Sequence, residues 1–141
     1  MINTANELSY NDISIGQQET FIIKITASMV EKFSNLSGDL NPLHMDNEFA
    51  ESSSFKKRIV HGMLLASFFS QLIGMKLPGK NALYFSQTLN FRSPCYVDDE
   101  IKVVGEVTEK SDSTQIITVS TSIFNKSKTC LIDGIAKIIV R

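Results

Sequence analysis

The sequence predicts an α+β fold in which a curved antiparallel sheet wraps around one long, hydrophobic central helix. Two features lead to this prediction. Residues 59–79 form the longest apolar segment of the chain, and residues 82–140 divide into about four strand-like segments separated by polar turns. A helix that is apolar on nearly all sides must be covered, and the strands that follow it can cover it. The 141 residues are expected to form a single domain.

Caps and periodicity predict the elements before the central helix. Residues 1–16 are expected to be an irregular lead-in, with turn signals at Asn11-Asp12 and Gly16. Residues 20–26, TFIIKIT, are rich in β-branched residues and predict a strand. Thr26 suits the N-cap of a helix over residues 27–37, and Asp46 suits the N-cap of a short helix over residues 47–53. The apolar residues of the first helix share one face: Met29, Val30, Phe33 and Leu36.

The central helix and the strands follow from hydrophobic pattern. Residues 59–79 read IVHGMLLASFFSQLIGMKLPG, and Pro78-Gly79 predicts the end of this helix. Apolar residues surround the helix almost completely, which is typical of a buried helix: Met63, Leu64, Leu65, Phe68, Phe69, Leu72 and Ile73. The predicted strands cover residues 82–91, 100–109, 115–124 and 129–140.

Composition excludes several classes of function. The net charge is -1 and the lysines and arginines are scattered among acids, so no nucleic-acid-binding surface is predicted. No segment approaches the apolar length of a membrane span, and the N-terminal residues lack the pattern of a signal peptide. Cys95 and Cys130 have no metal-ligand or redox spacing and are expected to be reduced. A cytoplasmic location is the default expectation.

The stretch SGDLNPLHMD, residues 37–46, contains the first candidate site. Asp39 and His44 are five positions apart, which on a continuous helix would separate them. Pro42 disfavours helical geometry at Asn41, so we expect a loop that brings the carboxylate and the imidazole to one cavity. Such a pair could hold a water and transfer protons near neutral pH. The alternative is that Asp39 and Asn41 only cap the turn and His44 is a packed histidine.

The second candidate site lies at the start of the hydrophobic helix. The backbone N–H of Gly62 could stabilise negative charge on a ligand carbonyl, since a helix N-terminus favours anions and glycine permits a close approach. Ser70 returns to nearly the same face eight residues later, and His61 could support the site or only bond at the helix entry. The alternative is that Gly62 only lets the helix pack tightly against the sheet. No metal site is predicted, because the two histidines are seventeen positions apart.

Taken together, SGDLNPLHMDNEFA (residues 37–50) and RIVHGMLLASFFSQLIGMKLPG (residues 58–79) closely resemble the (R)-specific enoyl-CoA hydratases of the MaoC-like dehydratase family. ALYFSQTLNFRSPCYVDDEI (residues 82–101) resembles the family's next segment. The resemblance extends over residues 9–140, nearly the whole chain. It implies one hot-dog domain over residues 1–141 and a homodimer with active sites at the subunit interface. It also implies reversible syn addition of water to a trans-2-enoyl-CoA, giving the (R)-3-hydroxyacyl-CoA.

The resemblance assigns a role to each candidate residue. Asp39 and His44 match the catalytic pair, and the Gly62 N–H matches the oxyanion donor. We expect Asp39 as base and His44 as acid, and the alternative is that the pair acts jointly on the water. Asn41 matches a motif residue that shapes the turn, and Ser70 matches a pocket serine. No cofactor is expected, since CoA or acyl-carrier protein enters as part of the substrate.

Three alternatives remain at this level. A 3-hydroxyacyl thioester dehydratase of fatty-acid or polyketide synthesis would run the same chemistry in reverse on a carrier protein. A thioesterase with the same fold fits the Asp39/His44 motif less well. A non-catalytic acyl-CoA-binding module would have no need of a proton-transfer pair. Turnover of crotonyl-CoA separates the enzymes that act on the enoyl group from the binding module.

Overall fold

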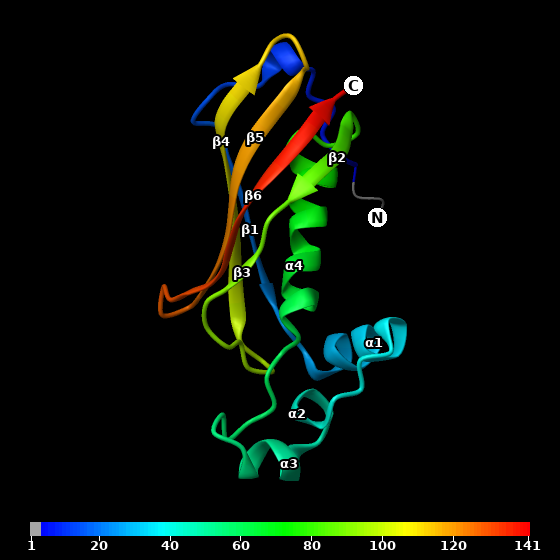
Figure 1. Ribbon diagram of the computed structural model, residues 1–141, viewed down its shortest axis with the longest axis vertical. Coiled ribbons are helices and arrows are strands. Elements are labelled where there is room, and N and C mark those ends of the chain that lie inside the picture. The colour runs from blue at the N-terminus through cyan, green and yellow to red at the C-terminus, as the bar shows by residue number, and fades with distance from the viewer. Residues whose placement is uncertain (1–3) are drawn as a thin grey trace.

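One antiparallel sheet and one long helix dominate the computed structural model, which describes residues 4–141 (Figure 1). The strand order is β1-β4-β5-β6-β2, and β3 also pairs with β6. The strands are β1 (Gln18–Lys24), β2 (Ala82–Gln87), β3 (Asn90–Phe91), β4 (Glu100–Ser111), β5 (Ile116–Asn125) and β6 (Cys130–Val140). The helix α4 (Gly62–Gln71) lies across one face of the sheet and continues into a π-helical turn, Leu72–Lys76 (Figure 1). The predicted fold class is therefore confirmed.

The shorter helices are a 3₁₀ turn at Tyr10–Asp12, α1 (Ala27–Ser37), α2 (Pro42–Met45) and α3 (Asn47–Ser52). Of these, α1 and α3 begin where the sequence predicts. The Thr26 side chain accepts a hydrogen bond from the Met29 backbone N–H at 3.2 Å, and the Asp46 carboxylate accepts from Glu48 at 2.9 Å. Both predicted N-caps are confirmed. The first three residues of the predicted lead-in lie outside the described residues.

The core fills the space between the sheet and α4. Residues along β4, β5 and β6 alternate between buried and more exposed positions, so one face of the sheet is apolar. The central part of the core joins α4 and the strands: Leu64, Leu65, Phe69, Leu72, Ile101, Val103 and Ile123. The helix lies so close to β4 that a Cβ at Gly105 would lie 2.6 Å from Leu72 Cδ2. Among residues 4–141, no helix is long and apolar enough to cross a membrane.

Four details of the sequence prediction were wrong. The α4 helix is buried on one side only, and its opposite side exposes 57% of Met63. Leu36, in the last turn of α1, is 87% exposed because the core ends before it. The expected loop around His44 contains a helical turn, α2, since Pro42 is suited to a first helical position. The strand predicted over residues 82–91 is divided into β2 and β3, with an irregularity in register between Tyr84 and Ser86.

Candidate active site

A tight turn after α1 carries Asp39. The helix ends at Gly38, which adopts the left-handed conformation at φ 79°. The Asp39 carboxylate accepts the Asn41 N–H at 3.2 Å, and the Asn41 side chain accepts the Leu43 N–H at 3.0 Å. Asn41 thus caps α2, and His44 follows within its single turn. These capping bonds are what the turn-only interpretation of Asp39 and Asn41 predicts, and they are also what brings Asp39 close to His44.

The tautomer of His44 follows from one contact. Its Nδ1 lies 2.7 Å from the carbonyl oxygen of Ile59. A carbonyl only accepts hydrogen bonds, so Nδ1 carries a proton and donates it. In the neutral ring Nε2 is then a free acceptor, and it can donate a proton only after the ring has become an imidazolium. His44 is half-buried, whereas Asp39 is exposed to solvent.

The structure brings the second histidine to the same place. His61, the N-cap residue of α4, is only 2% exposed, and its ring stacks on His44 with centroids 3.9 Å apart and an interplanar angle of 28°. Burial is the main cause that lowers the pKa of His61, and the neighbouring His44 adds to it. The ring is therefore neutral near pH 7. An oxygen of Asp39 and one ring nitrogen of each histidine all lie within 4.8 Å of one another.

This cluster has the residue types of a metal site, which the sequence spacing did not reveal. Its geometry favours proton transfer instead. Two imidazoles bind one ion when their in-plane lone pairs converge on it, whereas stacked rings direct those lone pairs side by side. His44 also uses Nδ1 for the Ile59 carbonyl. A carboxylate can accept a proton from water, and an imidazole nitrogen beside it can deliver another proton.

Gly62 connects this cluster to an apolar cleft. As the first residue of α4 its backbone N–H has no partner within the helix, so it is free to donate to a ligand. The ring of Phe91 lies directly against it, since a Cβ at position 62 would be 2.6 Å from Phe91 Cδ1. The cleft has a volume of about 320 Å³, and most of its lining is apolar: Phe55, Ile59, Val60, Leu65, Phe91 and Leu131, with Gly62 among them.

Neither Asn41 nor Ser70, the remaining predicted residues, is part of the Asp39 cluster or of the cleft lining. Asn41 is exposed and acts as the cap of α2. Ser70 lies on the exposed side of α4, two turns from Gly62. Cys95 lines the cleft, and burial raises the pKa of its thiol to about 12, so it is an inert packing residue at neutral pH. Both cysteines are free.

Sequence reasoning missed two contributors. Ser34 is completely buried, and its Oγ lies 3.0 Å from His61 Nε2. Its position on the same side of α1 as Val30, four residues earlier, was the available signal. The Ile59 carbonyl, which orients His44, carries no signal in the sequence because it belongs to a backbone that only the tertiary fold brings near.

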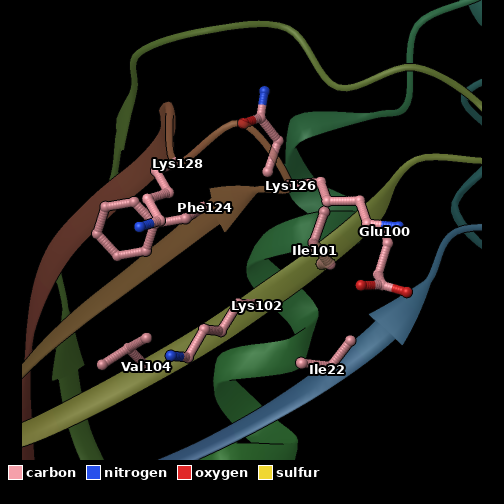
Figure 2. Close-up of a pocket in the computed structure, with 9 residues that line it drawn as sticks. Ile22, Glu100, Ile101, Lys102, Val104, Phe124, Lys126 and Lys128 are labelled. Atoms are coloured by element: carbon pink, nitrogen blue, oxygen red, sulfur yellow. The ribbon is translucent and has the colours of Figure 1, made fainter.

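A second depression lies on the other face of the sheet, with the strands between it and α4 (Figure 2). Its volume is about 420 Å³, and Figure 2 shows apolar side chains beside lysines on β1, β4, β5 and the turn after β5: Ile22, Val104, Phe124, Lys102, Lys126 and Lys128. Its lining includes none of the six predicted site residues. The cluster at Asp39 is therefore the better candidate for the active site.

Known proteins resemble this chain in sequence. Residues 13–128 match the MaoC like domain. The chain is 40% identical over 127 residues to the (R)-specific enoyl-CoA hydratase of Aeromonas caviae, covering 90% of this chain and 95% of that protein. It is also 40% identical over 114 residues to the mitochondrial 3-hydroxyacyl-[acyl-carrier-protein] dehydratase of Arabidopsis thaliana, covering 79% of this chain and 68% of that protein.

Solved structures of other proteins share this fold. The unliganded R-hydratase PhaJ1 from Pseudomonas aeruginosa superposes with a TM-score of 0.92 at 34% sequence identity, covering 96% of this chain and 87% of that one. The matched region contains the turn at Asp39, the N-terminus of α4 and most of the sheet. This chain therefore belongs to the MaoC-like domain family.

Proposed function

We propose that this protein is an (R)-specific enoyl-CoA hydratase, which adds water reversibly to a trans-2-enoyl-CoA and forms the (R)-3-hydroxyacyl-CoA. One observation carries the proposal. An oxygen of Asp39 and a ring nitrogen of His44 lie within 4.8 Å of each other, next to the N-terminus of the hydrophobic helix. The 40% identity to the A. caviae hydratase over nearly the full length of both chains supports the substrate class.

The reaction begins with the carbonyl of the thioester. A hydrogen bond from the Gly62 N–H polarises it and stabilises the enolate oxygen that develops when water attacks the β-carbon. Asp39 accepts a proton from the water as its oxygen adds to that carbon. The imidazolium of His44 donates the Nε2 proton to the α-carbon on the same face, which makes the addition syn. The proton on Asp39 then returns to His44, so the pair is restored.

This assignment places the acyl chain in the apolar cleft beside Gly62 and leaves the CoA portion outside. Addition of water transfers no electrons to or from the protein, so we propose that no cofactor is needed and that CoA is part of the substrate. Both cysteines are free, which is common in a reducing compartment, and we propose that the enzyme acts in the cytoplasm. Crotonyl-CoA is the smallest substrate that tests these assignments.

The first experiment is hydration of crotonyl-CoA, which is monitored through the loss of the enoyl absorbance. We expect turnover, and we expect no NADH when the product is offered to an (S)-specific 3-hydroxyacyl-CoA dehydrogenase. NADH formation in that coupled assay would mean that the stereochemistry is wrong. Tight binding of crotonyl-CoA without turnover would support the acyl-CoA-binding module instead.

A carrier-protein dehydratase is the second candidate, because the chain is equally identical to the Arabidopsis dehydratase over the region that matches. The two candidates share the chemistry and differ in the carrier. Comparing kcat/KM for crotonyl-CoA and for crotonyl-acyl-carrier protein decides between them. We expect the CoA thioester to be preferred, since the CoA hydratase matches over more of both chains.

We also propose a homodimer in which the sheets of two copies join through β2. This strand is at the end of the sheet, bears no charged residue and exposes 62% of Phe85 and 50% of Leu83. The opposite edge strand, β1, carries Glu19 and Lys24, and charged residues discourage pairing between edges. A second copy at β2 would cover the apolar edge.

Light scattering tests this assembly. Phe85→Lys should shift the wild-type dimer towards monomer and reduce activity, whereas Ile22→Lys on the opposite edge strand should leave the mass unchanged. A wild-type protein that is a fully active monomer at the assay concentration would rule the dimer out.

A further inference from the structure

His61 makes more contacts than a residue at the entry of a helix needs. The inference drawn from these contacts rests on the hydratase function proposed above. The His61 ring is buried at the N-cap of α4 and contacts three separate segments. Phe33 and Ser34 lie beside it on α1, the Asp39 carbonyl belongs to the turn after α1, and His44 on α2 stacks on its face.

The hydrogen bonds determine which nitrogen of His61 carries the proton. Nε2 lies 3.2 Å from the main-chain oxygen of Asp39, which can only accept, so Nε2 is an N–H donor. Ser34 Oγ, 3.0 Å away, can accept from the same N–H because its own hydroxyl donates to Met45 Sδ. The ring therefore has a consistent set of partners in the neutral Nε2–H tautomer.

The other nitrogen, Nδ1, has no partner. Among the described residues it is the one buried side-chain nitrogen or oxygen without a hydrogen bond. Protonating it would bury a positive charge with no acceptor, so burial keeps the ring neutral and lowers the pKa of His61. The titratable groups facing the ring are Asp39 from the turn and His44 from α2, while α1 contributes the uncharged Phe33 and Ser34.

A neutral ring at this position can serve both reacting groups. Its N–H holds the main chain of Asp39, and its face fixes the plane of His44. A neutral aromatic ring packs favourably against His44 in either protonation state, since a cation over an aromatic face is attracted to it. A charged ring there would repel the imidazolium of His44 at a ring separation of 3.9 Å.

We propose that His61 is a positioning residue for the hydration reaction. It is a buried imidazole that stays neutral, holds Asp39 through its main-chain carbonyl and holds His44 through ring stacking. It thereby keeps both groups aligned on one water, and its direct neighbour in the chain, Gly62, provides the N–H for the thioester carbonyl.

Two substitutions separate the two contacts. His61→Phe keeps an aromatic ring against His44 and removes the N–H donor to Asp39. His61→Gln keeps an amide N–H for the Asp39 carbonyl and removes the ring. We expect each to lower kcat by about 10–100-fold with a smaller change in KM, as for misplaced reacting groups. Thr121→Val, which removes a buried hydroxyl hydrogen bond far from the cluster, is the control and should lower the melting temperature without lowering kcat.

Double variants then distinguish positioning from general structural support. His61→Phe should cost much less in an Asp39→Asn background, where the group that it positions no longer acts as base. His61→Gln should likewise cost much less in a His44→Ala background. If His61 only supported the fold, its losses would multiply with the others in both backgrounds, and that result would overturn the proposal.

A measurement on the wild-type protein tests the proposal even if the His61 variants fail to fold. The chain has two histidines, so nitrogen-15 spectra of the ring nitrogens contain two sets of signals. We expect the His61 set to remain that of a neutral Nε2–H ring at about pH 6.5, where an ordinary imidazole is half protonated. Protonation of His61 Nδ1 at this pH, with activity retained, would overturn the proposal. Failure of the hydratase function would instead appear as wild-type protein without turnover.

Discussion

The two ends of the molecule use buried polar groups for different purposes (Figure 1). At the end opposite α1–α3, Tyr10 donates a hydrogen bond to Asp112 at 2.7 Å, and Lys110 donates to the backbone oxygens of Tyr10 and Ile13. The Lys110 ammonium also lies 4.2 Å from the centre of the Tyr10 ring. These contacts attach the lead-in to the sheet, and each polar group has a partner.

The end that contains Asp39 is organised differently. His61 is buried with one nitrogen unpaired, and the Asp39 carboxylate is exposed beside a histidine that retains a free nitrogen. An incompletely satisfied buried group lowers stability, so it persists where it serves another purpose. Polar substitutions around Tyr10 should therefore change stability, whereas those around Asp39 should change turnover.

The largest contrast should come from two matched Asp-to-Asn changes. Asp39→Asn keeps the shape and the capping acceptor but removes the proposed base, so kcat should fall by roughly 10²–10⁴-fold with little change in melting temperature. Asp112→Asn weakens the bond to Tyr10 and should lower the melting temperature while kcat stays the same. Steady-state kinetics and thermal unfolding of both variants are the measurements. A folded Asp39→Asn enzyme with near-normal turnover would support the turn-only interpretation.

His44→Ala should produce a loss of similar size, because it removes the group that we propose as proton donor to the α-carbon. If Asp39 and His44 act on the same water, the double variant should lose far less than the product of the two single losses. If His44 were only a packed histidine, His44→Ala would lower the melting temperature, and kcat would fall only as a consequence of the lower stability. Measuring kcat and melting temperature on the same three preparations separates these outcomes.

Two glycines on the same helical segment allow a smaller and sharper test. A methyl group at Gly62 would collide with the Phe91 ring at 2.6 Å, so Gly62→Ala must displace that ring from the cleft. We expect about a tenfold or greater loss in kcat/KM for crotonyl-CoA, since the proposed oxyanion donor and the cleft wall would both move. Gly74→Ala has open space around it and is the control. Equal kinetics for the two variants would remove Gly62 from the site.

The smallest expected effect is on the unfolding free energy at high pH, through Tyr10. Burial, with the hydrogen bond to Asp112, raises the pKa of Tyr10 to about 12, while an unfolded tyrosine titrates near 10. The stability that neutral Tyr10 contributes is complete below about pH 10 and is lost as the pH rises through about 12. Tyr10→Phe should therefore show a shallower loss of unfolding free energy across this window in urea titrations. Tyr84, whose pKa burial also raises, contributes equally to both proteins and cancels.

Elements with local causes were predictable from the residue types alone. Thr26 and Asp46 cap their helices as expected, because a side chain and an N–H two or three residues away are enough to form a cap. The pattern of β4, β5 and β6 was predictable because alternating burial appears directly in the residue types. The proximity of Asp39 and His44 was also predictable, because Gly38, Asn41 and Pro42 shape the turn within a few residues.

Features that depend on contacts between distant segments could be known from the folded structure only. The exposure of Leu36 and of one side of α4 depends on where the sheet ends, which periodicity does not report. The division of residues 82–91 into two strands depends on the register against β6. The stacking of His61 on His44 joins residues seventeen positions apart, and it exists because the Ile59 carbonyl and the start of α4 pack against α1 and α2. Such contacts arise from how whole elements pack, so no local pattern contains them.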